Sequence, residues 1–186
     1  MVKISPFGAL RYQPAVVGDL SRVIAPPYDV IDAALQDALY QRSPHNIVRL
    51  ILGRQVPSDT DGDSRYTRAR RDFDAWRRDG ALQADTTPAL YVIEHTFSDE
   101  GTTRARLGFI ALLGLDDQTR RSVYRHEATL AAPKADRTKL LEAVPANLSP
   151  IFCIYPDARG TVQEVLRAAA KSPPDAEANL AGERIR

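Results

Sequence analysis

The chain has 186 residues, of which 44% are hydrophobic and 26% charged, a composition typical of globular proteins. Its 25 basic and 24 acidic residues give a formal net charge of +1, which offers no support for a nucleic-acid or membrane-surface partner. One cysteine, Cys153, rules out an intrachain disulfide, the first residues are too polar for a signal peptide, and no apolar stretch is long enough to span a membrane. These features predict a soluble cytoplasmic protein with a sizeable core.

The predicted elements of the first third alternate between stiff loops, helices and extended segments. Prolines make residues 25–31 a rigid extended loop, after which Asp32 is placed to cap a helix that runs to about Arg42. Residues 47–52 are apolar and partly β-branched, so they are predicted to form a buried strand. Residues 53–64 combine Pro, Gly, Ser and Thr with three aspartates, a composition typical of a flexible loop.

The strongest helix signal lies between Ser64 and Asp79, with Gly80 as its C-terminal stop. Its apolar residues recur at spacings of three and four, so they are predicted to enter the core: Tyr66, Ala69, Phe73 and Trp76. Arginines occupy other positions of the helical wheel and are interpreted as a solvated face: Arg65, Arg68, Arg71, Arg77 and Arg78.

The second half of the chain predicts a hairpin, two helices and one more strand. Residues 89–97 and 105–115 are expected to pair as an antiparallel hairpin. A helix is expected from Lys134 to about Val144, then a buried strand over 151–155 that contains Cys153 as a structural thiol, then a helix over 160–171.

Because at least one strand pair is antiparallel, we expect an α+β fold with a mixed, partly antiparallel sheet and packed helices. An α/β fold with a doubly wound parallel sheet is the alternative. Residues 183–186 look like the beginning of a strand, which suggests that the single region 1–186 is a C-terminally truncated part of a longer protein.

Residues 126–137 carry the richest set of reactive side chains. His126 and Glu127 are neighbours in an extended segment, so they reach one site only where the strand ends or bulges. Pro133 is expected to open a helix whose first turn holds Lys134 and Arg137, and a helix N-terminus favours an anion. This pattern suggests a phosphate site with Glu127 as general base or Mg²⁺ ligand and His126 as proton shuttle.

A plainer interpretation of the same residues stays open. Asp136 would then complement the helix dipole, Lys134 and Arg137 would be solvated, and Glu127 would pair with an arginine. No zinc, nucleophile-elbow or dinucleotide motif is present to decide between the two interpretations.

Five further polar residues are candidate ligand contacts. Asn147 and Ser149 precede the predicted strand 151–155, where such residues either form a turn or bind a ligand at the end of a sheet. Tyr28 and Asp29 are held by the proline-rich loop. Arg49 lies in an apolar segment, where its charge requires a partner: either Asp29 or a bound anion.

Several segments, in this order, resemble the DUF1015 family: residues 6–12, 25–31, 43–50, 88–92, 108–111, 126–137 and 147–152. Family members are typically longer and commonly read His-Glu-Arg-Thr where this chain has Ala128. If that arginine contacts an anion, either Arg125 replaces it here or the site is weaker. The family is of uncharacterised function, and its genes are often found near serine-biosynthesis genes.

The residues and the resemblance together suggest a phosphotransferase-like enzyme that acts on a serine-pathway metabolite, with Mg²⁺ and a nucleotide as the cofactors that such chemistry would use. A non-catalytic protein that binds or senses the same metabolite is the alternative. In both cases the expected partner is a small molecule and neither nucleic acid nor a membrane.

Overall fold

The computed structural model describes residues 2–115, 121–124, 128 and 130–186. The chain divides into two compact units, each assembled from segments that are distant in the sequence. The sheet unit comprises Met1–Leu10, Ala84–Ala128 and Phe152–Arg186, and the helical unit comprises Arg11–Gln83 and Thr129–Ile151.

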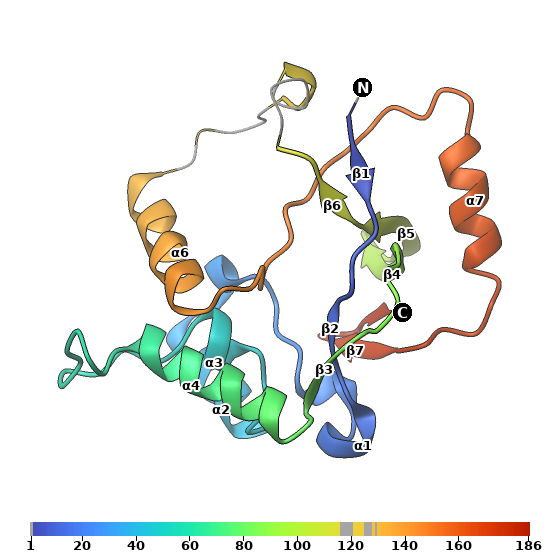
Figure 1. Ribbon diagram of the computed structural model, residues 1–186. Helices are drawn as coiled ribbons and strands as arrows, with labels where there is room; N and C mark the ends of the chain where they lie inside the picture. The colour runs from blue at the N-terminus through green and yellow to red at the C-terminus, as the bar shows by residue number, and fades with distance from the viewer. Residues whose placement is uncertain (1, 116–120, 125–127, 129) are drawn as a thin grey trace. The chain divides into compact units, whose positions relative to one another are not determined.

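A four-stranded antiparallel sheet forms the centre of the sheet unit (Figure 1). Its long hairpin pairs Tyr91 with Ile110 and Asp99 with Thr102, which confirms the predicted hairpin. Gly101 takes a positive φ of 79° in the tight turn between the two strands, a conformation that glycine adopts without steric cost. In the order β5-β4-β8-β7, the strands are Thr102–Ile110, Tyr91–Asp99, Glu183–Ile185 and Ala178–Leu180.

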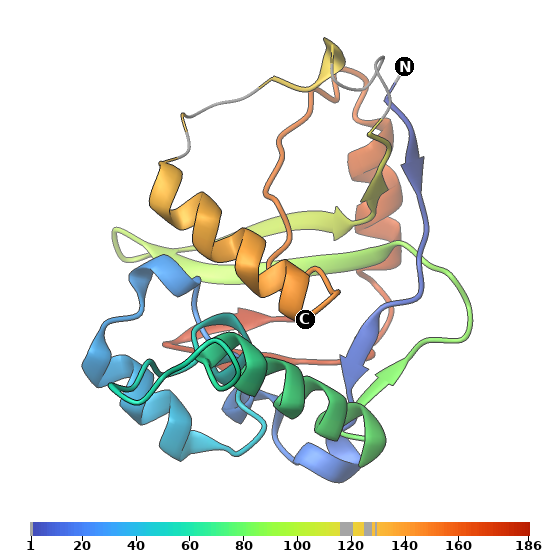
Figure 2. The ribbon, with the colours of Figure 1, turned by 60° about the vertical axis from the view of Figure 1, so that its left-hand side comes forward.

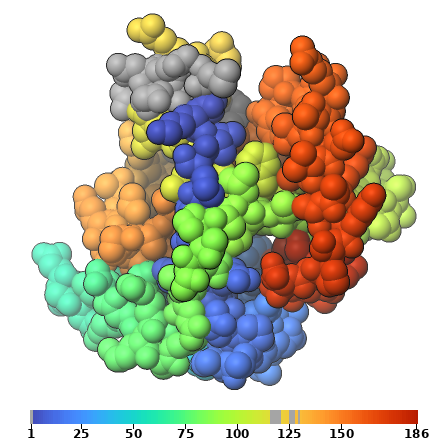
Figure 3. Space-filling view, turned by 45° about the vertical axis from the view of Figure 1, so that its right-hand side comes forward, coloured from blue at the N-terminus to red at the C-terminus, as the bar shows by residue number. Residues whose placement is uncertain are grey.

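The remaining elements of the sheet unit are short. Strand β1 (Ile4–Ser5) pairs antiparallel with β6 (Leu112–Leu113). An isolated bridge joins Phe7 to Ala89, so the N-terminal segment lies beside the segment that leads into β4 (Figure 3). Helix α7 (Thr161–Ala169) packs against β5 and buries Leu166.

Two of the helices in the helical unit begin and end as the sequence predicts. Asp32 caps α2 by accepting a hydrogen bond from the backbone of Leu35. Ser64 caps α4 through a reciprocal capping box with Thr67, and Gly80 follows its end with a φ of 81°. The helices are α1 (Pro14–Val17), α2 (Ala33–Arg42), α3 (Val48–Ile51), α4 (Arg65–Arg78) and α6 (Ala131–Ala143), with 3-10 turns at Leu20–Arg22 and Tyr28–Val30. Strands β2 (Leu10–Tyr12) and β3 (Leu82–Ala84) pair with each other.

The core of the helical unit forms where α4 and α6 pack together (Figure 2). Three of the four predicted core residues of α4, namely Ala69, Phe73 and Trp76, are buried, and Tyr66 packs against them at the edge. The rest of this cluster comes from α3, from α6 with the residue after it, and from the segment after α4: Leu50, Leu140, Val144, Ala81 and Leu82.

The prediction of a strand over residues 47–52 is wrong, although the segment is buried as predicted. Val48 to Ile51 form the helical turn α3, and Val48, Leu50 and Ile51 are buried. Fully buried Asn46 explains the helical turn, because its side chain accepts a hydrogen bond from the backbone of Val48 and donates two to other carbonyls. A helical turn therefore starts where the apolar run alone suggested an extended chain.

The buried strand predicted over residues 151–155 is also wrong. The segment takes part in no helix or strand, and Ile151 and Ile154 are each 88% exposed. Cys153 is exposed as well, so the predicted structural thiol is not in a core. Pro150 and Pro156 flank the segment and lack the backbone N–H that a sheet requires, which disfavours pairing at both ends.

The α+β fold is confirmed. The pairings β1–β6, β4–β5, β4–β8 and β7–β8 are all antiparallel, so the doubly wound alternative does not apply to this sheet. Across the part of the chain that the structure describes, none of the helices has the length and apolar character needed to cross a bilayer.

Candidate functional site

An ion network centred on Asp136 joins α4 to α6. Its carboxylate accepts hydrogen bonds from the guanidinium groups of Arg65 and Arg137 and, at 2.6 Å, from the hydroxyl of Tyr66. Helix α6 begins at Ala131, two residues before Pro133, so Asp136 lies in its second turn. The prediction that Asp136 and Arg137 occupy the first turn is therefore wrong, because the helix begins at Ala131 and its first turn ends at Lys134.

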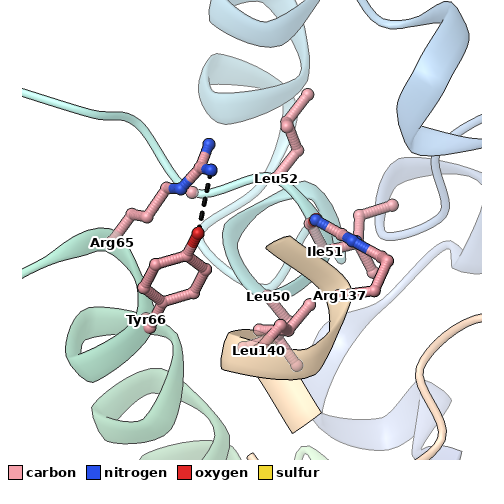
Figure 4. Close-up of a pocket in the computed structure, with 8 residues that line it drawn as sticks. Leu50, Ile51, Leu52, Arg65, Tyr66, Arg137 and Leu140 are labelled. Carbon is pink, nitrogen blue, oxygen red and sulfur yellow. Dashed lines mark hydrogen bonds between the residues drawn. The ribbon is translucent and has the colours of Figure 1, made fainter. Parts of the chain in front are cut away.

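The network also brings two predicted site residues together. The Arg137 guanidinium lies 4.0 Å from the centre of the Tyr28 ring and donates a hydrogen bond of 2.8 Å to the carbonyl of Ile51. Figure 4 shows Arg137 and Leu140 of α6 beside Arg65 and Tyr66 of α4 around a small cavity. The volume of this cavity is about 10 Å³, enough for one water molecule but not for a metabolite.

Asp136 stays ionised in this setting. Burial acts to raise the pKa of its carboxyl, but hydrogen bonds from Tyr66 and Arg137 and the charges of Arg137 and Arg65 outweigh burial and lower the pKa. Burial, and then the hydrogen bond to Asp136, raise the pKa of Tyr66. Arg137 is thus held by a carboxylate, and the network as it stands is an internal ion cluster.

Arg49 lies on α3, and its partner is not Asp29. Its Nη2 donates to the backbone carbonyl of Tyr40 at 3.0 Å, and its guanidinium lies 4.3 Å from the centre of the Tyr40 ring. Of the two predicted partners, Asp29 is exposed and forms no ion pair with Arg49 among the described residues, and a bound anion stays a prediction. The Nε atom of Arg49 is buried and finds no hydrogen-bond acceptor among the described residues. One charged donor is thereby left for another acceptor.

Arg49 also lines a groove of about 920 Å³ that we name the arginine groove. This volume is in the range of pockets that hold metabolites. Five arginines line the groove: Arg49, Arg54, Arg68, Arg71 and Arg78. Three aspartates also line it, Asp63, Asp72 and Asp74, so that its lining carries an excess of positive charge.

Helix α4 supplies one wall of the groove. Arg68, Arg71, Ala75 and Arg78 follow one another at helical spacing on the face away from the core, and Ala75 leaves room between the long side chains. The sequence interpretation of these arginines as a solvated face overlooked this groove. The spacing i, i+3, i+10 of these arginines in the sequence could have indicated that they share one helix face. It could not indicate a groove, because the opposite wall comes from α2, α3 and the loop that follows α3.

Asp72 is the acidic residue of the groove with a shifted pKa. Its burial raises the pKa of the carboxyl, and the charges of Arg49 and Arg71 only partly oppose this effect. This carboxyl is therefore held less favourably in its charged form than an exposed aspartate.

Three other predicted site residues that the structure describes join neither the Asp136 network nor the lining of the arginine groove. Lys134 is exposed on α6, and Asn147 and Ser149 are exposed after its end. His126 and Glu127 lie outside the described residues. Of the predicted set, the structure brings Tyr28 and Arg137 together and places Arg49 in the arginine groove.

The described residues contain no group of three or more His, Cys, Asp or Glu side chains that could hold a metal ion. Comparison with known proteins finds no curated protein and no solved structure that matches the chain. A family model described as "Protein of unknown function (DUF1015)" matches residues 4–186. Since this match spans essentially the whole chain, including the segments that form the arginine groove and the Asp136 network, the protein belongs to the DUF1015 family.

Proposed function

We propose that this protein binds a phosphorylated small molecule in the arginine groove and transfers a phosphoryl group to or from a serine-pathway metabolite. The observation that carries the proposal is the groove itself, which has the volume of a metabolite site and five arginines. Guanidinium groups bind phosphate through paired, charge-assisted hydrogen bonds. Arg49 is one of the lining arginines, and its Nε has no hydrogen-bond acceptor among the described residues.

Phosphoryl transfer depends mainly on positioning and on neutralising the charge of the transferred group. The groove arginines would supply this charge. Glu127 is proposed to take the proton of the acceptor hydroxyl as its oxygen attacks phosphorus, and His126 to protonate the departing oxygen. The remaining candidates from the sequence do not line the groove, and they are proposed only as contacts of the second substrate beside it: Tyr28, Asp29, Lys134, Arg137, Asn147 and Ser149.

A non-catalytic protein that senses the same phosphorylated metabolite would use the same groove. The variant Glu127→Gln distinguishes the two functions, because an enzyme would lose turnover while keeping its affinity for the ligand. A protein that only binds the metabolite would show no turnover with either Glu127 or Gln at this position.

The binding part of the proposal is tested by thermal shift with ATP, ADP, serine and phosphoserine, each with and without Mg²⁺. A ligand that binds only the folded chain raises the unfolding midpoint. We expect Arg49→Met to abolish the shift. Arg77→Met is the matched control, because Arg77 is also on α4 but lies over Phe73, 5.6 Å from the ring centre.

If no phosphate compound raises the midpoint of the unsubstituted protein, the proposed function is wrong. If Arg49→Met and Arg77→Met bind equally well, the ligand does not use the groove. Circular dichroism of both variants shows whether they are folded before binding is compared.

A further inference from the structure

The loop between Gly53 and Ser64, residues 54–63, places carboxylates on the arginines of the groove, and we name it the acidic loop. Asp59 lies with Oδ1 2.7 Å from Nη2 of Arg68. Asp63 lies with Oδ1 2.7 Å from Nη2 of Arg71 and 3.6 Å from Nη1 of Arg68. Two cations of the α4 wall are therefore occupied by carboxylates of the chain itself.

The base of the acidic loop, at Arg54, has further attachments beside these pairs. The backbone N–H of Arg54 donates to the Tyr40 hydroxyl at 3.0 Å, and its guanidinium pairs with Asp37 at 2.6 Å. Its carbonyl accepts a hydrogen bond from Arg68 at 2.8 Å. The distal part contacts α4 through Asp59, whose side chain is 15% exposed, and through Asp63, whose side chain is 61% exposed and whose pair with Arg71 is therefore the more solvated. Solvent weakens such an exposed pair, so an incoming anion can replace it.

The pairs of Asp59 and Asp63 with Arg68 and Arg71 indicate which ligand groups these arginines can bind. Carboxylate and phosphate oxygens take the same paired hydrogen bonds from a guanidinium group. Arg68 and Arg71 are three residues apart on a helix, where side chains begin about 5–6 Å from each other. A three-carbon acid that carries a phosphate at one end and a carboxylate at the other has two anionic groups at a comparable separation.

We infer that the acidic loop is an internal competitor of the ligand: the groove binds a small phosphorylated acid whose two anionic groups displace Asp59 and Asp63 from Arg68 and Arg71. This inference rests on the proposed function, and it adds the class of the ligand and the way the loop regulates its binding. The loop opens when the ligand binds, and its carboxylates lower the affinity of the groove for every anion.

The ligand class is tested with two compounds that differ by one anionic group. O-phosphoserine carries a phosphate, an amine and a carboxylate, whereas O-phosphoethanolamine lacks the carboxylate. We expect isothermal titration calorimetry to show that O-phosphoserine binds about tenfold more tightly, the effect of one charge-assisted contact.

Equal affinities for the two compounds would overturn the inference and leave the proposed function intact. If neither these compounds nor any other phosphate compound binds, the proposed function fails, and the inference fails with it.

The competition is tested by the double variant Asp59→Asn/Asp63→Asn, which keeps the shape of both side chains and removes their charges. We expect its affinity for O-phosphoserine to rise about three- to tenfold, since the exposed Asp63 pairs and the more buried Asp59 pair no longer oppose binding. Asp61→Asn is the matched control, because Asp61 is exposed in the same loop and takes part in neither pair with α4. Its affinity should not change.

Limited proteinase K digestion gives a second, independent measurement of loop opening. We expect O-phosphoserine to speed cleavage between residues 56 and 62 in the unsubstituted protein, and the double variant to be cleaved fast there without ligand. Unchanged affinity of the double variant, or protection of this segment by the ligand, would overturn the inference. Circular dichroism checks that each variant is folded.

Discussion

At the scale of single residues, Asp136 links α4 to α6 through hydrogen bonds and ion pairs. It accepts hydrogen bonds from Arg65, Tyr66 and Arg137, and its side chain is only 18% exposed. We expect Asp136→Asn to lower the free energy of unfolding by about 2–3 kcal/mol, because two half-buried guanidinium groups lose their counter-charge. Urea unfolding at pH 7 measures this. The exposed Asp74, paired with Arg70, is the control, and Asp74→Asn should cost about 0.5 kcal/mol or less.

The lowered pKa of Asp136 also predicts the pH at which its contribution disappears. The unfolded chain takes up the proton near the ordinary pKa of 3.8, and the folded chain only at lower pH. The stabilisation is thus fully present above that value and is lost as the pH falls through the folded pKa. We expect the difference in unfolding free energy between the unsubstituted protein and Asp136→Asn to be constant from pH 7 to 5 and to shrink below pH 4. A difference independent of pH down to 3 would contradict this assignment.

At the scale of elements, the helical turn α3 depends on a single polar side chain. Asn46 is fully buried, donates to the carbonyls of Arg22 and Ile24 and accepts from the N–H of Val48. We expect Asn46→Ala to cost about 2–4 kcal/mol, because it leaves buried backbone groups without partners. Chemical denaturation measures this cost. The exposed Asn147 is the matched control, and Asn147→Ala should change stability by less than about 0.5 kcal/mol.

The elements predicted correctly from the sequence are those whose signals lie within a few residues. Helix α4 has its cap at Ser64, its apolar spacing and its stop at Gly80, all inside one segment. The apolar runs at 47–52 and 151–155 were assigned wrongly because periodicity does not distinguish short apolar runs. Asn46 turned the first into a helix, and flanking prolines kept the second from pairing.

At the scale of the whole molecule, the buried apolar side chains are unevenly distributed between the sheet unit and the helical unit. Among the described residues, only Leu166 and Ala178 of the buried apolar residues belong to the sheet unit, and the others belong to the helical unit. We expect amide hydrogen exchange to be slowest in α4 and near Leu140 and faster in α7, β7 and β8, because regions with few buried apolar contacts open at lower free energy. Exchange followed by mass spectrometry measures this. Equal protection in α7 and α4 would contradict the expectation.

The sequence by itself determined the α+β class, the hairpin, the helices α2 and α4 and the family, because each depends on local pattern or on motifs in a fixed order. Tertiary structure alone decided which charges meet. Arg137 is joined to Tyr28 across more than a hundred residues, and Arg49 to a groove whose other wall is α4. The arginines of α4 line a groove only because the acidic loop and α3 pack beside them. Contacts between distant residues follow from how whole elements pack, and no spacing along the chain records that packing.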